Sequence, residues 1–308
     1  MESEVIELFD KYASINKFKY SHEFILNDST INTYFIFKGI LLSFVDIKDY
    51  QPHEEDVKKH YNKRLLEINH CNNGRYLYET NNKITYFRKG DLCISVFNLK
   101  KSKSEFPLGY YSGLQILIDA DMANKQISKY IPNFNLIDFY NKLNDENGYL
   151  LIKSNEQIDH IISEIYNVDN NIKETYFKLK ILELLLFFSV SEFPKIKNRE
   201  ISINHAKIIE QVKNDLTTDL TKHVTIDQLA NKYSISPTTL KNSFKKIYGK
   251  PIFQWQKEYK LDYACKLLNE GTYNISEISE MIGYKSSSNF TKSFKKHVGC
   301  SPSEYRKY

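Results

Sequence analysis

The stretch Thr239–Gly249, "TLKNSFKKIYG", returns fifty positions later as Asn289–Gly299, "NFTKSFKKHVG". The four letters "SFKK" are identical in the two copies, and the large apolar residues and the closing glycine occupy matching places. A repeat at a fixed spacing indicates that one structural unit is used twice. Because the apolar residues recur at helical spacing, each copy predicts an amphipathic helix with one buried face.

The first copy has the order of a helix-turn-helix. A short amphipathic helix is predicted from the apolar residues Ile226, Leu229, Ala230 and Tyr233. The turn is expected at Ser234 and Ile235. Ser236 then provides an N-cap and Pro237 a first helical residue for the second helix. Its inward face is formed by Leu240, Phe244 and Ile247.

The second copy repeats this order. Its first helix carries Ile275, Ile278 and Ile282, and Gly283 supplies the left-handed residue that commonly ends a helix. Ser286 or Ser287 can cap the next helix, whose inward residues are Phe290, Phe294 and Val298. The sequence therefore predicts two helix-turn-helix units.

The outward residues of both second helices suit DNA. Ser236–Lys250 and Lys285–Val298 each contain four lysines and no acidic residue, whereas a merely solvated helix usually mixes the two signs. Hydroxyl and amide side chains at a helix start can reach base edges in the major groove, and lysines can meet phosphates. We predict DNA contacts from Pro237, Thr238, Thr239, Lys241, Asn242, Lys245, Ser286, Ser287, Ser288, Asn289, Lys292, Lys295 and Lys296.

The chain between the two units predicts a long helix that ends near Gly271. Apolar residues lie on one face of "IFQWQKEYKLDYACKLLNE", and about 16 helical residues would span roughly 24 Å. With flanking packing, a helix of this length can place two recognition helices about one DNA turn apart, near 34 Å. One chain could then bind two successive major grooves.

From about Ala206 to Tyr308 the sequence resembles the AraC/XylS family of bacterial transcription regulators. The stretch that carries the resemblance is "LDYACKLLNEGTYNISEISEMIGYKSSSNFTKSFKKHVGCSPSEYRK". The resemblance implies two helix-turn-helix units joined by a linker helix, with base-reading positions at the start of each second helix. Two positions depart from the family pattern: Ser279 replaces a common Ala, and Lys260 replaces an Arg, which would weaken a phosphate contact there.

The N-terminal part reads differently. Runs rich in Tyr, Phe, Ile and Leu between about 20 and 118, punctuated by Asn, Gly and Asp, predict short strands, among them "RLLEINH" and "GRYLYET" as two separate strands. Their spacing favours a sandwich or small barrel, and the resemblance implies a small, cupin-like β-barrel sensing domain. Helices are expected at about 155–192, where apolar residues recur at three and four positions.

These patterns give an α+β fold with three segments. We expect an N-terminal sensing and dimerisation domain over 1–192, β-rich to about 120; a polar linker with Pro194 over 193–204; and an all-α DNA-binding domain over 205–308. The helices at about 156–190 carry more apolar surface than one stripe needs, so they either form a homodimer or pack wholly within the chain.

Charge and cysteine content fit this division. Residues 203–308 carry 17 Lys and Arg against 10 Asp and Glu, a surplus of seven, so the first 202 residues carry −2 of the net +5. The four cysteines form no ligand pair, the N-terminus lacks a secretory pattern, and no apolar run reaches the roughly 20 residues of a membrane span. We expect a cytoplasmic protein with no cofactor, no metal site and no catalytic residue.

The sequence thus predicts a sequence-specific DNA-binding transcription regulator, an activator whose partners are promoter DNA, RNA polymerase and a small effector. Two alternatives stay open. The N-terminal domain could only dimerise, which would make a ligand-independent activator, or it could be an enzyme tethered to DNA. The pair His70-Cys71 suggests either a metal or ligand contact or an ordinary strand end.

Overall fold

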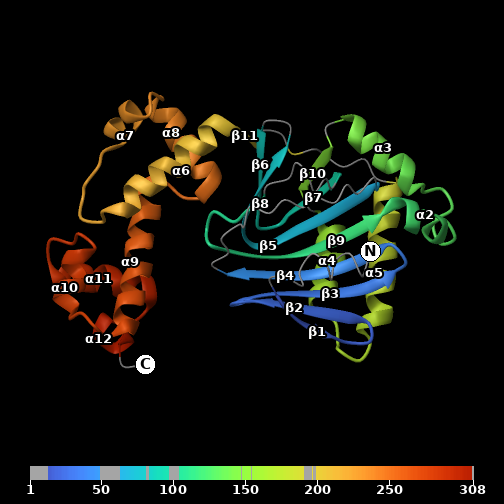
Figure 1. The fold of residues 1–308 in the computed structure, drawn as a ribbon, viewed down its shortest axis with the longest axis horizontal. Helices are drawn as coiled ribbons and strands as arrows, with labels where there is room; N and C mark the ends of the chain where they lie inside the picture. The colour runs from blue at the N-terminus through green and yellow to red at the C-terminus, as the bar shows by residue number, and fades with distance from the viewer. Residues whose placement is uncertain are drawn as a thin grey trace. The chain divides into compact units, whose positions relative to one another are not determined.

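The computed structural model describes residues 13–48, 63–80, 83–96, 104–146, 148–153, 155–190, 196 and 199–306. The chain forms two compact units, Met1–Glu200 and Ile201–Tyr308. The first unit combines a sheet with helices and the second is almost wholly helical (Figure 1), which confirms the α+β class.

The sheet of the first unit is antiparallel in its registered strand pairs, and its strands follow the order β1-β2-β3-β4-β9-β5-β6-β11. Off this path, β7 pairs with β5 and β10, and β8 pairs with β5. The bounds are β1 Ser14–Lys17, β2 Ser21–Leu26, β3 Ser29–Phe37, β4 Ile40–Lys48, β5 Leu65–Thr80, β6 Lys83–Arg88, β7 Asp91–Val96, β8 Ser104–Glu105, β9 Tyr110–Asp119, β10 Tyr149–Lys153 and β11 Glu200–Ser202.

The expected small barrel is not confirmed. Among the described strands no hydrogen bonding joins β1 to the opposite edge, so the sheet stays open. The long strand β5 explains part of this arrangement. Its first half pairs with β9 and β7 and its second half with β6 and β8, so the sheet divides along β5 instead of closing on itself.

Strand β5 also corrects a second prediction. "RLLEINH" and "GRYLYET" lie on one continuous strand of 16 residues, with a bulge between Cys71 and Asn73 opposite β9. Gly74 has a φ of +87°, and a Cβ there would lie 2.5 Å from the carbonyl oxygen of Tyr110. The turn-type residues Asn72, Asn73 and Gly74 therefore form a bulge inside a strand, which needs the same backbone freedom as a turn.

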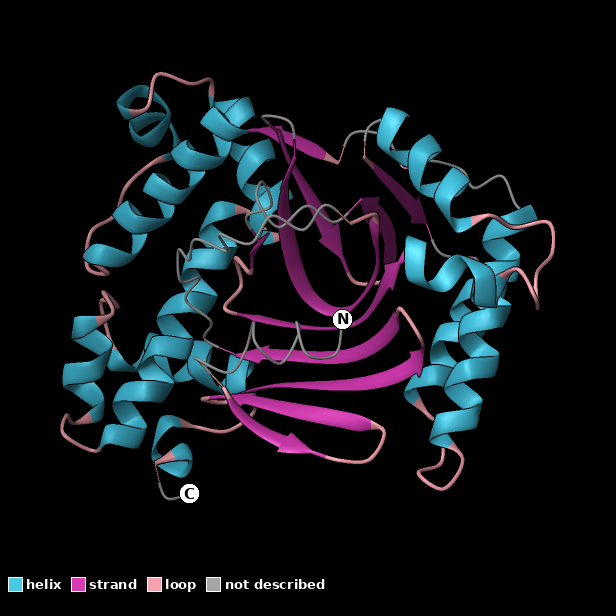
Figure 2. Ribbon diagram, turned by 45° about the vertical axis from the view of Figure 1, so that its right-hand side comes forward, coloured by secondary structure: helices cyan, strands magenta, loops and turns pink. Residues whose placement is uncertain are grey.

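Four helices cover one face of this sheet (Figure 2): α2 Ala120–Ile127, α3 Leu136–Glu146, α4 Glu156–Tyr166 and α5 Lys173–Val190. The two predicted helices near 155–192 are α4 and α5. Their apolar side chains and those of the sheet form one core, which includes Leu42, Ile68, Ile94, Ile116, Ile162 and Phe177.

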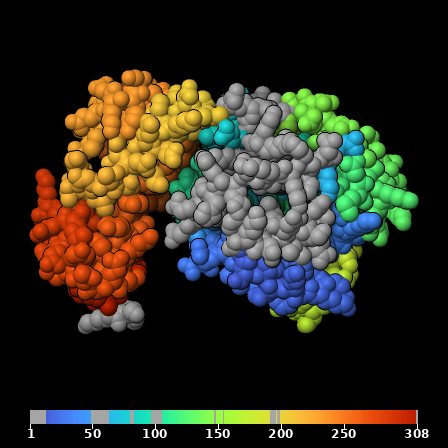
Figure 3. Space-filling view, in the orientation of Figure 1, coloured from blue at the N-terminus to red at the C-terminus, as the bar shows by residue number. Residues whose placement is uncertain are grey.

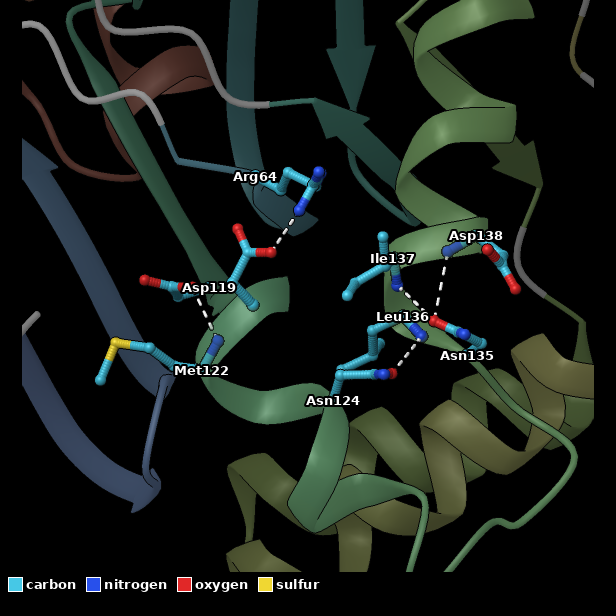
Figure 4. A network of polar contacts seen from close by, with 9 residues as sticks. Arg64, Asp119, Met122, Asn124, Asn135, Leu136, Ile137 and Asp138 are labelled. Carbon is cyan, nitrogen blue, oxygen red and sulfur yellow. Dashed lines mark hydrogen bonds and ion pairs between the residues drawn. The ribbon is translucent and has the colours of Figure 1, made fainter.

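Helices α2 and α3 have no counterpart among the sequence predictions, although short polar side chains fix both helix starts (Figure 4). Asp119 caps α2 by accepting a hydrogen bond from Met122 N at 3.0 Å. Asn135 accepts from Ile137 N at 2.9 Å, and Asn124 of α2 accepts from Leu136 N at 2.8 Å. The side chain of Asn124 thereby fastens the start of α3 to α2.

The second unit consists of seven helices within its described residues, coloured yellow to red in Figure 3. Their bounds are α6 Ile203–Thr218, α7 Ile226–Lys232, α8 Pro237–Tyr248, α9 Ile252–Glu270, α10 Ile275–Met281, α11 Ser287–Val298 and α12 Pro302–Tyr305. Two helix-turn-helix units, α7–α8 and α10–α11, are thus joined by the linker helix α9, as predicted. No described helix is long and apolar enough to cross a membrane.

Candidate nucleic-acid interface and a buried polar band

The first helix-turn-helix unit is set by its caps. Thr225 and Gln228 form a capping box at the start of α7. Ser236 caps α8 by accepting from Thr239 N at 3.0 Å, with Pro237 in the first turn, and Gly249 ends the helix at a φ of +80°. The predicted inward residues Leu240, Phe244 and Ile247 are buried.

The second helix-turn-helix unit has the same caps, formed by other residues. Asn274 and Glu277 form the capping box of α10, and Ser286 caps α11 by accepting from Asn289 N at 3.3 Å. Gly299 ends α11 with a φ of +98°. Phe290 and Phe294 are fully buried and Val298 is half-buried. Of the two serines proposed as the cap, Ser286 is the one that caps.

The turns between the helices differ in one residue. Ser234 takes a left-handed φ of +52° in the first unit, and Gly283 takes +75° in the second. A Cβ on Gly283 would lie 2.5 Å from the carbonyl oxygen of Leu220. The second turn therefore packs directly on the backbone that precedes α7, and only glycine fits there.

The residues predicted to contact DNA lie on α8 and α11 and at their starts. All thirteen are exposed except Thr239 and Ser287, which are half-buried. The hydroxyls of these two are engaged within the unit, since Thr239 Oγ1 lies 2.8 Å from Ser236 Oγ and Ser287 Oγ lies 3.2 Å from Ser276 Oγ. Thr238, Asn242, Ser288 and Asn289 keep the exposure that a base contact needs. Their contact with bases stays a prediction.

Four lysines on these faces have no acidic partner among the residues that the structure describes. Within the described residues no ion pair involves Lys241, Lys245, Lys292 or Lys295. Lys250, which the sequence counts with these lysines, instead forms an ion pair with Glu258 of α9. Sequence spacing could not reveal that pair, because Lys250 and Glu258 lie in different elements. The uncompensated lysines leave both faces positive.

Helix α9 joins the two helix-turn-helix units and packs against both. Phe244 and Tyr248 of α8 pack against Trp255, with ring centroids 5.5 and 5.0 Å away. Farther along α9, Leu261, Ala264, Leu267 and Leu268 pack with Phe290 and Phe294 of α11 in one cluster. A polar contact adds to this packing, since His297 Nε2 lies 2.7 Å from Asp262 Oδ1. At 19 residues the helix is about 28 Å long.

The N-terminal compact unit, Met1–Glu200, contains a second candidate site, which the sequence analysis missed. On the sheet face opposite the helices, polar residues stand directly opposite one another across adjacent strands. We call this row the polar band; its residues are His22, Thr33, Ser43, Gln115, Asn69, Glu67 and Ser95. All are buried except Gln115, which is half-buried.

Glu67 is the acidic member of the polar band. Gln115 Nε2 donates to Glu67 Oε1, and Ser95 Oγ donates to Glu67 Oε2 at 3.4 Å. Burial raises the pKa of Glu67, although the hydrogen bonds from Gln115, Asn69 and Ser95 oppose this. Such a row reads in sequence as the solvated face of a strand, so alternation alone could not identify it.

The pair His70-Cys71 is split by the sheet. Adjacent residues of a strand point to opposite faces. His70 contacts Tyr166 of α4, with its Nδ1 3.4 Å from the hydroxyl, whereas Cys71 lies in a cluster on the other face with Tyr76 and Tyr111. Burial lowers the pKa of His70 to about 4. No group of three or more potential metal ligands occurs within the described residues.

Comparisons with known proteins find relatives of this chain, and one family match falls within the helical compact unit Ile201–Tyr308. A family described as a helix-turn-helix domain matches residues 229–308. The lactose operon transcription activator of Staphylococcus xylosus is 28% identical over 60% of this chain and 64% of its own length. The transcriptional activator AggR of Escherichia coli is 23% identical over 82% of this chain and 98% of its own length.

Among solved structures, ToxT from Vibrio cholerae is 15% identical, with a TM-score of 0.31, and the match covers 87% of this chain and 98% of that one. The chain thus spans somewhat under two thirds of the first of these activators and nearly all of the second. Since the matched residues 229–308 contain α8, α9, α10 and α11 with their caps, the C-terminal domain of this chain is a helix-turn-helix domain of the AraC type.

Proposed function

We propose that the chain is a sequence-specific DNA-binding transcription activator that contacts promoter DNA with α8 and α11. One observation carries this proposal: two helix-turn-helix units with matching caps share one linker helix and present exposed lysines. Four of these have no acidic partner among the described residues, namely Lys241, Lys245, Lys292 and Lys295. Such faces supply the charge that neutralises phosphates, while the residues at the helix starts supply base contacts. Contact with RNA polymerase follows from the activator role.

Selection from a random duplex pool tests this function. The full chain should retain duplexes that share two half-sites about one helical turn apart, with affinity that falls steeply as salt rises. Retention of all duplexes alike at modest salt, or of none, would contradict sequence-specific binding. A single enriched half-site would contradict the use of both units.

We further propose that a small effector with several hydrogen-bonding groups binds the polar band. A row of seven polar side chains on one sheet face offers donors and acceptors that an apolar core does not need. Calorimetry with a panel of sugars, polyols and amino compounds should find a binder that Glu67→Gln weakens. If apolar compounds bind instead, or if the affinity of a binder is unaffected by Glu67→Gln, the band is not the site.

Dimerisation through α5 is the third part of the proposal. Phe177, Ile181 and Leu184 of α5 are buried, while Leu179, Leu186 and Val190 are 58, 49 and 75% exposed. With the half-buried Leu182, the residues Leu179 and Leu186 follow the 3-4 spacing of a coiled-coil seam. Lys178 and Glu183 flank this seam five positions apart, the separation at which opposite charges pair across a parallel coiled coil. A second copy of α5 fits this stripe.

The two alternatives predict other results. A ligand-independent activator would bind its operator with the same affinity whatever compound is added. A tethered enzyme would need a reactive constellation in the first unit. The relatives named above are transcription activators, and this favours regulation without catalysis.

A further inference from the structure

The last residues of the first unit are fastened to its sheet. Ile196 N donates to Leu151 O at 2.9 Å, and Tyr86 N donates to Arg199 O at 3.1 Å. Arg199 Nη2 lies 3.3 Å from Asp91 Oδ1, with 8 and 5% of the two side chains exposed. The guanidinium also lies over the ring of Tyr86, 5.2 Å from its centroid. We call residues 196 and 199–200 with these contacts the latch.

Glu200 completes the latch. Its carboxylate accepts from Tyr149 Oη at 2.6 Å and pairs with Lys83 Nζ at 2.6 Å. Lys83 and Tyr149 both lower the pKa of Glu200, and burial together with Glu200 raises the pKa of Tyr149 to about 12. The carboxylate and the neutral phenol are therefore the forms present near neutral pH. Ile201 follows directly in the second unit, and α6 begins at Ile203.

The latch is held mostly by polar contacts. A buried ion pair contributes little net stability, because desolvation offsets the attraction, but the loss of one partner leaves a buried charge unpaired. A partial movement that separated Arg199 from Asp91 while Asp91 stayed buried would therefore be costly.

The latch also touches the polar band. Glu67, Ser95 and Tyr149 stand directly opposite one another on β5, β7 and β10 and so share one face. Ser95 donates to Glu67 in the band, and Tyr149, the next residue of the row, donates to Glu200 in the latch. Asp91 lies on the same face of β7 as Ser95, four residues away. Glu67 is thus connected to Glu200 through Ser95 and Tyr149, which are register partners on β7 and β10.

The geometry points to a coupling element: the latch is a releasable strand segment through which the state of the polar band alters DNA binding by the second unit. This inference rests on the proposed function. The coupling depends on Tyr149, which lies opposite Ser95 of the polar band and donates a hydrogen bond to Glu200 of the latch. Release would free β11, Glu200–Ser202, directly ahead of α6.

Hydrogen exchange of the full chain tests the coupling, with the amides of Tyr86 and Ile196 as reporters because both donate across the latch. Tyr149→Phe removes only a hydroxyl, and it should speed exchange at both amides about tenfold, since a hydrogen bond to a charged group is lost. Tyr130→Phe, at a 58% exposed tyrosine, is the matched control and should leave both amides unchanged. Glu67→Gln should also change their exchange.

Binding is reciprocal, so the duplex selected by the chain should change exchange at Tyr86 and Ile196 by about fivefold or more. Tyr149→Phe should change the affinity for that duplex by about threefold or more. If the duplex binds and both amides exchange at the same rate as before, the coupling is wrong. If no duplex is selected, the DNA-binding function fails instead. Hydrogen exchange in Glu67→Gln then still tests the link between the polar band and the latch. If the amides of Tyr86 and Ile196 exchange at the wild-type rate in this variant, that link is wrong.

Discussion

At the scale of single residues, Ser279 buries a hydroxyl without a partner. The side chain is 1% exposed, and its Oγ has no hydrogen bond within the described residues. The matching residue of the first helix-turn-helix unit is Ala230, which is fully buried. Since an unsatisfied buried hydroxyl loses its hydration without return, Ser279→Ala should raise the free energy of unfolding by about 1 to 3 kcal/mol in urea titrations.

Ala230→Ser is the reverse experiment and should lower the free energy of unfolding by a similar amount. If Ser279→Ala lowers it, the hydroxyl has a partner in solution.

Gly283 and Gly271 separate two costs of replacing a left-handed glycine. Both have positive φ, +75° and +73°, but an added Cβ meets Leu220 O at 2.5 Å at Gly283 and nothing within 4 Å at Gly271. Gly271→Ala should therefore cost only the left-handed strain, about 1 to 2 kcal/mol. Gly283→Ala should cost clearly more in chemical unfolding. Equal costs would show that the loop at Leu220 moves away without penalty.

At the scale of elements, we expect different residues of α11 to contact bases and phosphates. Lys295→Ala should weaken binding to all sequences and reduce the salt slope by about 1, as expected for one lost phosphate contact. Asn289→Ala should instead lose about 1 to 3 kcal/mol of discrimination at one base pair. Fluorescence anisotropy with cognate and random duplexes at several salt concentrations measures both. Equal losses on the two kinds of duplex for both variants would contradict this assignment.

Helix α5 should control the oligomeric state. Leu179→Glu with Leu186→Glu places like charges along the proposed seam, so a dimer should become a monomer in sedimentation experiments. The melting temperature of the first unit should change little, because both side chains are already about half exposed or more. Lys142→Glu, at an exposed residue of α3, is the control for added acidic charge. A wild-type chain that is monomeric at high concentration would contradict the seam.

The sequence predicts elements well where the deciding chemistry is local. Ser236, Pro237, Gly249, Gly271 and Gly283 occupy the caps and turns expected from residue type alone. It fails where burial depends on distant strands. Glu67 and Ser95 look like solvent-facing strand residues until the register places them side by side. Gly74 looks like a turn residue until β9 packs against it.

At the scale of the whole molecule, the same limit affects the segment between the units. Polarity and Pro194 predict a linker over 193–204, yet Arg199 is buried against Asp91, 108 positions earlier in the chain. Burial raises the pKa of Asp91, while Arg199 and Arg88 oppose this shift. A buried arginine in a polar segment has no local signal, because its acidic partner is far away in sequence. Only the fold brings the two together.

Two compact units should unfold in two transitions, and only the first should depend on His70. Burial lowers the pKa of His70 to about 4 from an ordinary value near 6.5, so the unfolded first unit binds a proton that the folded one rejects. Its stability is complete above about pH 6.5 and falls by about 3 kcal/mol as the pH drops toward 4. Calorimetry should show this loss, and His70→Gln should reduce it. Trp255, the only tryptophan, lies in the second unit, so its fluorescence identifies the transition that His70→Gln should leave unchanged. If both transitions lose the pH dependence in His70→Gln, the two units do not unfold independently.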